Sequence, residues 1–323
     1  MLHSLYSLIK VLESSKIITV CVITYNHNEF ISHALNSIAA QKTNFNYDIL
    51  IADDCSTDGT KEKVLAFSKS RSNVSLILQG SNVGPAKNFI ELISTPKTKY
   101  ISYLEGDDYW TDPYKLQKQV DYLEANPDVS CCATRFNAIY NNAVKKTLFP
   151  NHTKIIKHDL VSVLNSNWSP VQTLTMVFRT DILKPKLHLL ANKSIYAGDY
   201  TMTVLLALKG EIHVLPDNTG NKREDSEGVW ESLHDSLKCR KLIETMDETA
   251  KLIPFKYKKL VANRINHHVD YLLLNVATNG PKLIKTTIFL LGLHVRNRHI
   301  TILCLKYIIN LTRIKLGRLK SQF

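Results

Sequence analysis

The sequence predicts an α/β domain, with a mixed, mostly parallel sheet flanked by helices, followed by a helical C-terminal extension. Between residues 17 and 104, short β-branched runs alternate with segments that carry apolar residues at helical spacing, which is the pattern of βαβ units. The length of 323 residues is enough for one large domain with an appendage. The formal charge of +12 resides at the end of the chain, because residues 236–323 hold 17 Lys and Arg but only 4 Asp and Glu.

The first predicted strand, at residues 17–24, is a continuous β-branched run, as expected for a strand buried on both faces of a sheet. Elements of alternating type follow it: helices at 29–41, 60–70 and 85–93, and strands at 48–52, 74–78 and 100–104. Right-handed crossovers between parallel strands bring their carboxyl ends to one edge of the sheet. Ligands of open α/β sheets bind at that edge, so we expect the functional site there.

Beyond residue 104 the alternation is less regular. We predict helices at 112–126 and 200–208, and strands at 129–133, 173–178 and 211–215. Residues 141–158 are predicted to form a loop, and residues 217–228 a polar, glycine-containing loop suited to act as a mobile lid. The chain then divides into an N-terminal helix at 1–16, a main domain at 17–235 and a basic, amphipathic helical tail at 236–323, with helix breaks at Pro254 and at 279–281.

The basic tail predicts an anionic partner surface. Its charges are interleaved with aliphatic residues rather than with stacking aromatic ones, which favours an anionic membrane over nucleic acid. The alternative is that the tail packs on the main domain and forms a homodimer. The longest apolar stretch, residues 286–295, is too short to span a bilayer, and residues 1–16 do not resemble a secretory signal. We therefore expect a cytoplasmic protein, peripheral on the inner face of the cell membrane, with six reduced cysteines.

Acidic residues follow two of the predicted strands. Glu105, Asp107 and Asp108 lie within four positions, and such a cluster repels itself unless protons or a cation intervene. Carboxylate oxygens suit Mg²⁺ or Mn²⁺, while the alternative is an acidic turn that caps the next helix. Asp53 and Asp54 are placed to accept hydrogen bonds from a base or ribose, with loop-to-helix turn chemistry as the alternative. No glycine-rich phosphate loop of the dinucleotide-binding or P-loop type occurs, so nucleotide phosphates at this edge need a metal.

Four segments together resemble family 2 glycosyltransferases with the GT-A fold: TVCVITYNHNEFISHALNSIAAQ, ILIADDCSTDGT, SNVGPAKNFIEL and YISYLEGDDYWTDPYKLQKQVDYLEANPD. The resemblance covers residues 17–130 strongly and continues more weakly to about 230. It implies a nucleotide-sugar donor, with UDP favoured, and a divalent metal, Mn²⁺ or Mg²⁺. By this resemblance the donor contacts are Tyr25, Asn26, Asp53, Asp54 and Glu105, and the metal ligands are Asp107 and Asp108. Lys87 and Asn88 are further candidate nucleotide contacts, with a solvated helix face as the alternative.

The resemblance also assigns roles nearer the end of the main domain. The segment around Asp199 resembles the family's general base, and a helix beginning at Tyr200 would hold that carboxylate ionised. The alternative is that Asp199 only caps this helix. Relatives carry a Y-R-x-H-x-x-G-x-W segment, in which Arg223 and Trp230 here keep the pattern as donor contacts. Asp225 stands where His is expected and is the third predicted metal ligand.

The implied function is an inverting, metal-dependent transfer of a sugar to a hydroxyl of a saccharide acceptor, lipid-linked acceptors included, in cell-surface polysaccharide biosynthesis. One alternative is a catalytically inactive nucleotide-sugar-binding protein or membrane-surface scaffold. A nucleotidyltransferase is a second alternative, but it would need a glycine-rich loop after the first strand, where Tyr25-Asn26-His27-Asn28 has no glycine. A nucleic-acid-binding protein that uses the tail is the third.

Overall fold

The computed structural model describes residues 16–141, 143–148, 153–166, 169–224 and 233–276. The chain divides into two compact units, residues 1–228 and 229–323. Residues 1–15 of the expected N-terminal helix, and the part of the tail beyond residue 276, lie outside the described residues. Among the described ranges, no helix combines the length and the apolar character that are needed to span a bilayer.

The described strands of the first unit join one mixed sheet. They are β1 (Ile18–Thr24), β2 (Tyr47–Asp53), β3 (Val74–Leu78), β4 (Tyr100–Glu105), β5 (Tyr109–Trp110), β6 (Val129–Tyr140), β7 (Ala143–Leu148), β8 (Ile156–His158), β9 (Val177–Arg179) and β10 (Glu211–Arg223). The strand order is β3-β2-β1-β4-β9-β6-β10-β5, with β7 paired to β6 and β8 paired to β10. Strands β1 to β4 are mutually parallel, whereas β9 runs antiparallel to both of its neighbours.

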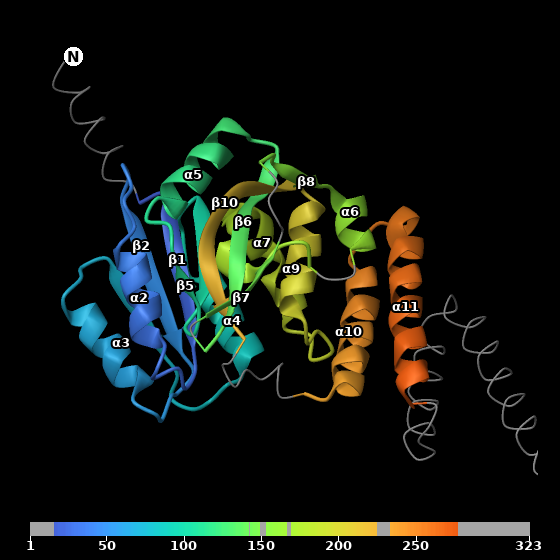
Figure 1. Ribbon diagram of the computed structural model, residues 1–323, viewed down its shortest axis with the longest axis horizontal. Helices are drawn as coiled ribbons and strands as arrows, with labels where there is room; N and C mark the ends of the chain where they lie inside the picture. Colours follow the sequence, from blue (N-terminus) through green and yellow to red (C-terminus); the bar gives the residue numbers. More distant parts are fainter. Residues whose placement is uncertain (1–15, 142, 149–152, 167–168, 225–232, 277–323) are drawn as a thin grey trace, which may run out of the picture. The chain divides into compact units, whose positions relative to one another are not determined.

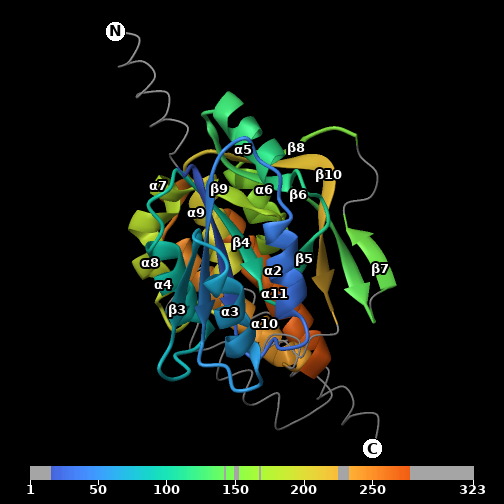
Figure 2. The same ribbon diagram turned by 90° about the vertical axis from the view of Figure 1, so that its left-hand side faces the viewer.

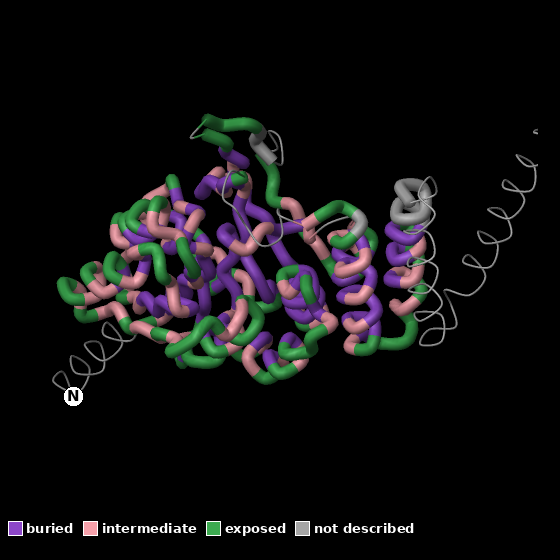
Figure 3. Tube along the Cα trace, turned by 90° about the horizontal axis from the view of Figure 1, so that it is seen from below, coloured by how far each residue is buried: buried purple, intermediate pink, exposed green. Residues whose placement is uncertain are grey.

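Helices cover both faces of this sheet (Figure 1). The described helices of the unit are α2 (Ile31–Ala39), α3 (Thr60–Lys69), α4 (Pro85–Ser94), α5 (Lys115–Ala125), α6 (Leu160–Asn165), α7 (Thr180–Leu183), α8 (Leu187–Leu190) and α9 (Gly198–Ala207), with 3₁₀ turns η1 (Thr173–Thr175) and η2 (Lys184–Lys186). Apolar residues of α2, α3 and α5 form one core with β1 and β2, while α4 packs on the opposite face. Strands β1, β2, β4 and β6 of the sheet are accordingly buried along most of their length (Figure 3).

The sequence predicted β1 to β4 and their helices to within about two residues, but it missed pairings in the second half. Residues 141–158, expected to be a loop, contain β7 and β8. Strand β7 forms a hairpin with the long strand β6 at the side of the unit (Figure 2). In this hairpin Lys146 and Thr147 pair with residues of β6 in antiparallel register. The segment expected as a strand at 173–178 begins instead with the 3₁₀ turn η1.

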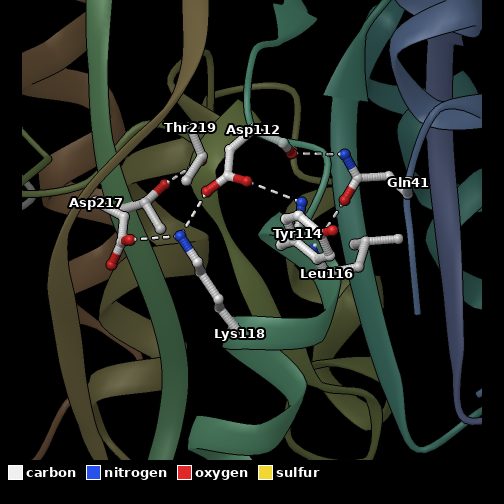
Figure 4. A network of polar contacts seen from close by, with 8 residues as sticks. Gln41, Asp112, Tyr114, Leu116, Lys118, Asp217 and Thr219 are labelled. Carbon is white, nitrogen blue, oxygen red and sulfur yellow. Dashed lines mark hydrogen bonds and ion pairs between the residues drawn. The ribbon is translucent and has the colours of Figure 1, made fainter. Parts of the chain in front are cut away.

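The expected lid at 217–228 is wrong for its first half, which is strand. Residues up to Arg223 belong to β10, which pairs with β6 and β5. The side chain of Lys118 makes ion pairs with Asp217 at 2.6 Å and with Asp112 at 2.8 Å (Figure 4). Asp112 in turn bonds Gln41 through its backbone oxygen, so the start of α5 is tied to both β10 and the end of α2. These bonds fix the segment that follows the acidic turn at 105–108.

The described part of the second unit is a pair of helices, α10 (Asp235–Ala250) and α11 (Lys258–Val276), joined through the 3₁₀ turn η3 (Phe255–Tyr257). The two helices lie side by side (Figure 1), with Ile243, Met246, Val261 and Ile265 buried. The helix break predicted at Pro254 is confirmed, since Pro254 precedes η3. The described cysteines, in both units, take part in no disulfide with one another.

Candidate functional site

The carboxyl ends of β2, β1 and β4 lie next to one another, as the sequence predicted. In the parallel registers, Thr24 at the end of β1 pairs with Asp53 of β2, and Ile23 pairs with Glu105 of β4. The loops that follow these three strands therefore share one edge of the sheet. They contain most of the predicted donor and metal residues, and their contacts show which side chains remain available to a ligand.

Asn26 locks the loop after β1 onto the loop after β2. Its backbone has a positive φ of 55°, which asparagine tolerates better than most residues. The Asn26 amide donates to Ser56 Oγ at 2.9 Å, and its side-chain oxygen accepts from the Thr57 amide at 3.0 Å. Tyr25, by contrast, is 42% exposed. Of this predicted pair, Tyr25 has an exposed ring, while Asn26 holds the loops together.

Asp53 and Asp54 are both buried and both accept hydrogen bonds from the protein. The carboxylate of Asp53 accepts from the amide and the hydroxyl of Ser56. Asp54 accepts from the backbone amides of Val83 and Gly84, at 2.7 and 3.0 Å. The loop after β3 is thus fastened to the end of β2, so Asp54 shapes this edge whether or not it also touches a ligand.

The neighbouring residues Lys87 and Asn88 differ in burial and in their contacts. Asn88 is fully buried, and its side-chain amide donates to the backbone oxygen of Ala52 in β2 and accepts from Gln79. The solvated-face alternative is therefore wrong for Asn88, which ties α4 to the sheet. Lys87 is exposed on the same helix turn.

The acidic turn after β4 packs tightly beneath the loop after β1. A Cβ atom on Gly106 would come within 2.8 Å of both Thr24 and His27, so only glycine fits there. Glu105 accepts a hydrogen bond from the hydroxyl of Thr173 in η1, and its other oxygen, Oε2, is buried without a hydrogen-bond partner among the described residues. One oxygen of Asp108 accepts from the Arg223 amide at 2.8 Å.

Asp107 differs from its neighbours. It is partly exposed, and within the described ranges its carboxylate makes no hydrogen bond or ion pair with the protein. Burial and the adjacent Asp107 charge raise the pKa of Glu105 to about 7. Burial, Asp107 and Glu105 likewise raise the pKa of Asp108 well above its usual range, and the positive charge of Lys222 offsets both effects in part. The protein therefore favours the protonated forms of Glu105 and Asp108, and further positive charge in this turn would favour their ionised forms.

The donor chemistry of this turn suits a hard divalent cation. Oxygen ligands are what Mg²⁺ and Mn²⁺ prefer, and Glu105 Oε2 is the kind of buried, unpartnered oxygen that a cation or its water would satisfy. The described residues hold no group of three or more His, Cys, Asp or Glu side chains arranged to bind a metal by themselves. A cation bound through one or two carboxylates and substrate phosphates does not need such a group.

Arg223, a predicted donor contact, lies next to the acidic turn through its backbone amide, which donates to Asp108. Its guanidinium stacks over the rings of Phe30 and Tyr109, with its central carbon 4.7 and 5.2 Å from the ring centroids. His33 also stacks on Tyr109, at 3.8 Å between centroids, and its Nδ1 lies 3.4 Å from an Arg223 nitrogen. Burial and the Arg223 charge lower the pKa of His33, which favours the neutral form of its ring beside the arginine. Asp225 and Trp230 lie outside the described residues.

Asp199 is exposed in the first turn of α9. The N-cap position of this helix is Ala197, so the alternative that Asp199 is the capping residue is wrong. A carboxylate in the first turn interacts favourably with the positive end of the helix dipole, which supports its ionised form.

Sequence reasoning missed Thr173 and Lys222 as site residues, since Thr173 lies 68 positions from the glutamate it binds and Lys222 sits in what was expected to be loop.

Comparison with known proteins gives consistent results. The model of the family Glycosyl transferase family 2 matches residues 19–184. An uncharacterized protein of Mycobacterium tuberculosis is 32% identical over 213 residues, which cover 66% of this chain and 60% of that protein. The chain thus spans less than two thirds of the length of this relative.

Two solved structures share the fold. The Staphylococcus aureus enzyme TarS in complex with UDP-GlcNAc superposes with a TM-score of 0.64 at 20% identity, over 85% of this chain and 80% of that one. The mannosyltransferase PcManGT of Pyrobaculum calidifontis, in complex with GDP-Man and Mn²⁺, gives a TM-score of 0.54 at 14% identity, over 94% and 82% of the two chains. At these identities the similarity establishes the architecture alone.

Proposed function

This chain belongs to glycosyltransferase family 2 and has the GT-A fold, and from that premise we propose that it transfers a sugar from a nucleotide-sugar donor, with UDP favoured, to a hydroxyl of a saccharide acceptor. The observation that carries the proposal is the acidic turn at 105–108, where the described residues hydrogen-bond only one oxygen of Glu105 and one of Asp108, at the sheet edge shared with Tyr25 and Asp54. A pyrophosphate is itself anionic, so it can share this edge only if positive charge is supplied.

We propose that Asp107 is the principal metal ligand of this turn, with Asp108 as the second. Asp107 is the one acidic residue of the turn whose carboxylate makes no hydrogen bond or ion pair among the described residues. A bound Mn²⁺ or Mg²⁺ would neutralise charge on the leaving nucleoside diphosphate. We propose that Glu105, which Thr173 holds, accepts a hydrogen bond from a ribose hydroxyl, and that Arg223 and Lys222 add positive charge beside the turn. Tyr25 offers a face on which a base can stack.

In the proposed reaction, Asp199 takes the proton from the acceptor hydroxyl while that oxygen attacks the anomeric carbon. The C–O bond to the diphosphate breaks on the opposite face of the sugar, so the configuration inverts. The exposed position of Asp199 fits a residue that meets an incoming acceptor. This assignment rests on the family resemblance of the segment around Asp199 and on its place in the first turn of α9.

We propose that the acceptor belongs to a cell-surface polysaccharide and reaches the enzyme at a membrane surface. TarS, a relative 24% identical over 263 residues, is named as a poly(ribitol-phosphate) β-N-acetylglucosaminyltransferase. The net positive charge of residues 236–323 supports attraction to the anionic inner face of the cell membrane, where lipid-linked acceptors would be found. Homodimerisation through the tail is the competing use of the same segment.

The experiment is product formation from a panel of UDP- and GDP-sugars, with Mn²⁺, Mg²⁺ or a chelator. We expect the protein to turn over at least one donor in the presence of metal, and we expect the chelator to abolish that turnover. Asp199→Asn should lower the rate roughly 10²–10⁴-fold, whereas Asp181→Asn, which changes an acid in the first turn of α7, should not. Donor binding without any turnover would identify an inactive nucleotide-sugar-binding protein, and undiminished turnover by Asp199→Asn would reject the assigned base.

A further inference from the structure

The turn between α10 and α11 exposes an aromatic side chain. Phe255 is 81% exposed, more than any other large apolar side chain that the structure describes. It follows Pro254, and the Tyr257 amide bonds the Pro254 oxygen at 3.0 Å, so the chain around it is ordered by η3. Ile253, two residues earlier, is buried. The turn therefore buries one apolar residue and presents another to solvent.

Lysines flank this aromatic residue in the sequence. Residues 251–259, which we call the α10–α11 tip, contain four lysines and no acidic residue. Lys251 pairs with Glu248 at 2.6 Å. The other three, Lys256, Lys258 and Lys259, have no carboxylate partner within the described residues. Two of them lie in the first turn of α11, where the helix end carries like charge, so the tip is an unneutralised positive surface.

We propose that the α10–α11 tip is a contact site for an anionic lipid surface, with Phe255 inserted among the headgroups. An aromatic ring buried at the interface with lysines around it combines apolar transfer with attraction to negative headgroups, and lysine stems reach back to the surface. A protein partner would be expected to use a contiguous apolar patch, whereas here a single ring stands among cations. The inference rests on the membrane association proposed above and assigns it to named residues.

The test is flotation of the full-length chain with vesicles of phosphatidylcholine alone or with one quarter phosphatidylglycerol. The wild-type chain should float with the anionic vesicles only, and less so at high salt. Phe255→Ser should lower the partition coefficient about tenfold, and Phe255→Trp should restore it. The triple change Lys256→Gln, Lys258→Gln, Lys259→Gln should lower it roughly hundredfold at low salt.

Matched controls separate this site from general charge and hydrophobicity. Leu237→Ser removes a side chain 42% exposed on α10, and a triple Gln variant of Lys61, Lys69 and Lys97 removes the same charge from the first unit; both should float like the wild type. If Phe255→Ser floats like the wild type, the α10–α11 tip is not the contact, although the rest of the tail still is. If no form floats, membrane association fails with it. A change from dimer to monomer with unchanged flotation would assign the tip to a second copy of the chain.

Discussion

Two acidic turns at the same edge of the sheet differ in how far their carboxylates are satisfied. The turn after β2 carries Asp53, Asp54 and Asp58, and all six of their oxygens accept hydrogen bonds from the protein. The turn after β4 carries Glu105, Asp107 and Asp108, where the structure describes protein hydrogen bonds to only one oxygen of Glu105 and one of Asp108. Each turn has three carboxylates, but the turn after β2 is saturated with protein hydrogen bonds, whereas the turn after β4 is unsaturated.

The difference teaches which turn builds the edge and which serves a ligand. Burial would raise the pKa of Asp58, but hydrogen bonds from Thr60 and from backbone amides outweigh it and lower that pKa. Burial and mutual repulsion raise the pKa of Glu105 and Asp108. The protein alone therefore favours the ionised form of Asp58, whereas it disfavours the ionised forms of Glu105 and Asp108, which added positive charge would stabilise.

The largest expected effect is a loss of transfer activity when a carboxylate is removed from the turn after β4, compared with the same change in the turn after β2. Asp107→Asn should lower kcat/KM for transfer roughly 10²–10³-fold, because it removes the carboxylate we assign to the cation. Asp58→Asn should leave the transfer rate near that of the wild type while lowering the melting temperature. Initial rates at saturating Mn²⁺, together with thermal melts, measure both. Comparable rate losses in the two variants would show that the two turns are not functionally distinct.

Asp54→Asn tests whether the saturated turn is structural. An asparagine cannot accept both the Val83 and the Gly84 amides, so one buried donor loses its partner, at a cost of about 1–3 kcal/mol in unfolding free energy. We expect donor affinity to fall with stability, and kcat to stay near the wild-type value once donor is saturating. Denaturant unfolding and steady-state kinetics would show this, and a large fall in kcat at unchanged stability would contradict it.

Thr173→Val tests whether the hydrogen bond from Thr173 to Glu105 in the turn after β4 contributes to donor binding. The substitution keeps the shape of the side chain and removes the hydroxyl that bonds Glu105, so KM for the donor should rise about tenfold at nearly constant kcat. Thr173→Ser should restore the wild-type KM. Thr175→Val is the matched control, since Thr175 is buried in the same 3₁₀ turn but bonds the backbone oxygen of Gln172. Equal effects of the two valine variants would mean that the turn itself, rather than the bond to Glu105, is being disturbed.

The same contrast explains what the sequence could predict. Periodicity located β1 to β4 and the acidic turns because those signals are local, and the parallel registers follow from the βαβ pattern. Strands β7 and β8 were missed because their pairing depends on β6 and β10, whose residues are distant in the sequence or extend past the apolar run. The saturation of Asp54 was equally hidden, since its donors are two loop amides about thirty positions away with no side-chain signature.

The smallest effect, a pH dependence of stability, has opposite signs in the two turns. A carboxyl whose pKa is raised on folding, such as Glu105 from 4.5 to about 7, binds more protons in the native than in the unfolded state across that window. Its contribution to stability is therefore complete below about pH 4.5 and is lost as the pH rises through about 7. The lowered pKa of Asp58 acts in the reverse direction, with stability lost only as the pH falls below its ordinary value of 3.8.

Thermal melts in chelator, taken from pH 4.5 to 8 for the wild type and Glu105→Gln, isolate the first contribution. Other groups titrate in both proteins, so the difference between the two curves is the quantity to measure. We expect Glu105→Gln to gain about 2–5 °C relative to the wild type as the pH rises across this range. Mn²⁺ should reduce the gain at high pH, because a cation in the turn offsets the repulsion that the glutamine removes. A difference that stays constant with pH would mean that the protein already neutralises this turn, and the contrast between the two turns would disappear.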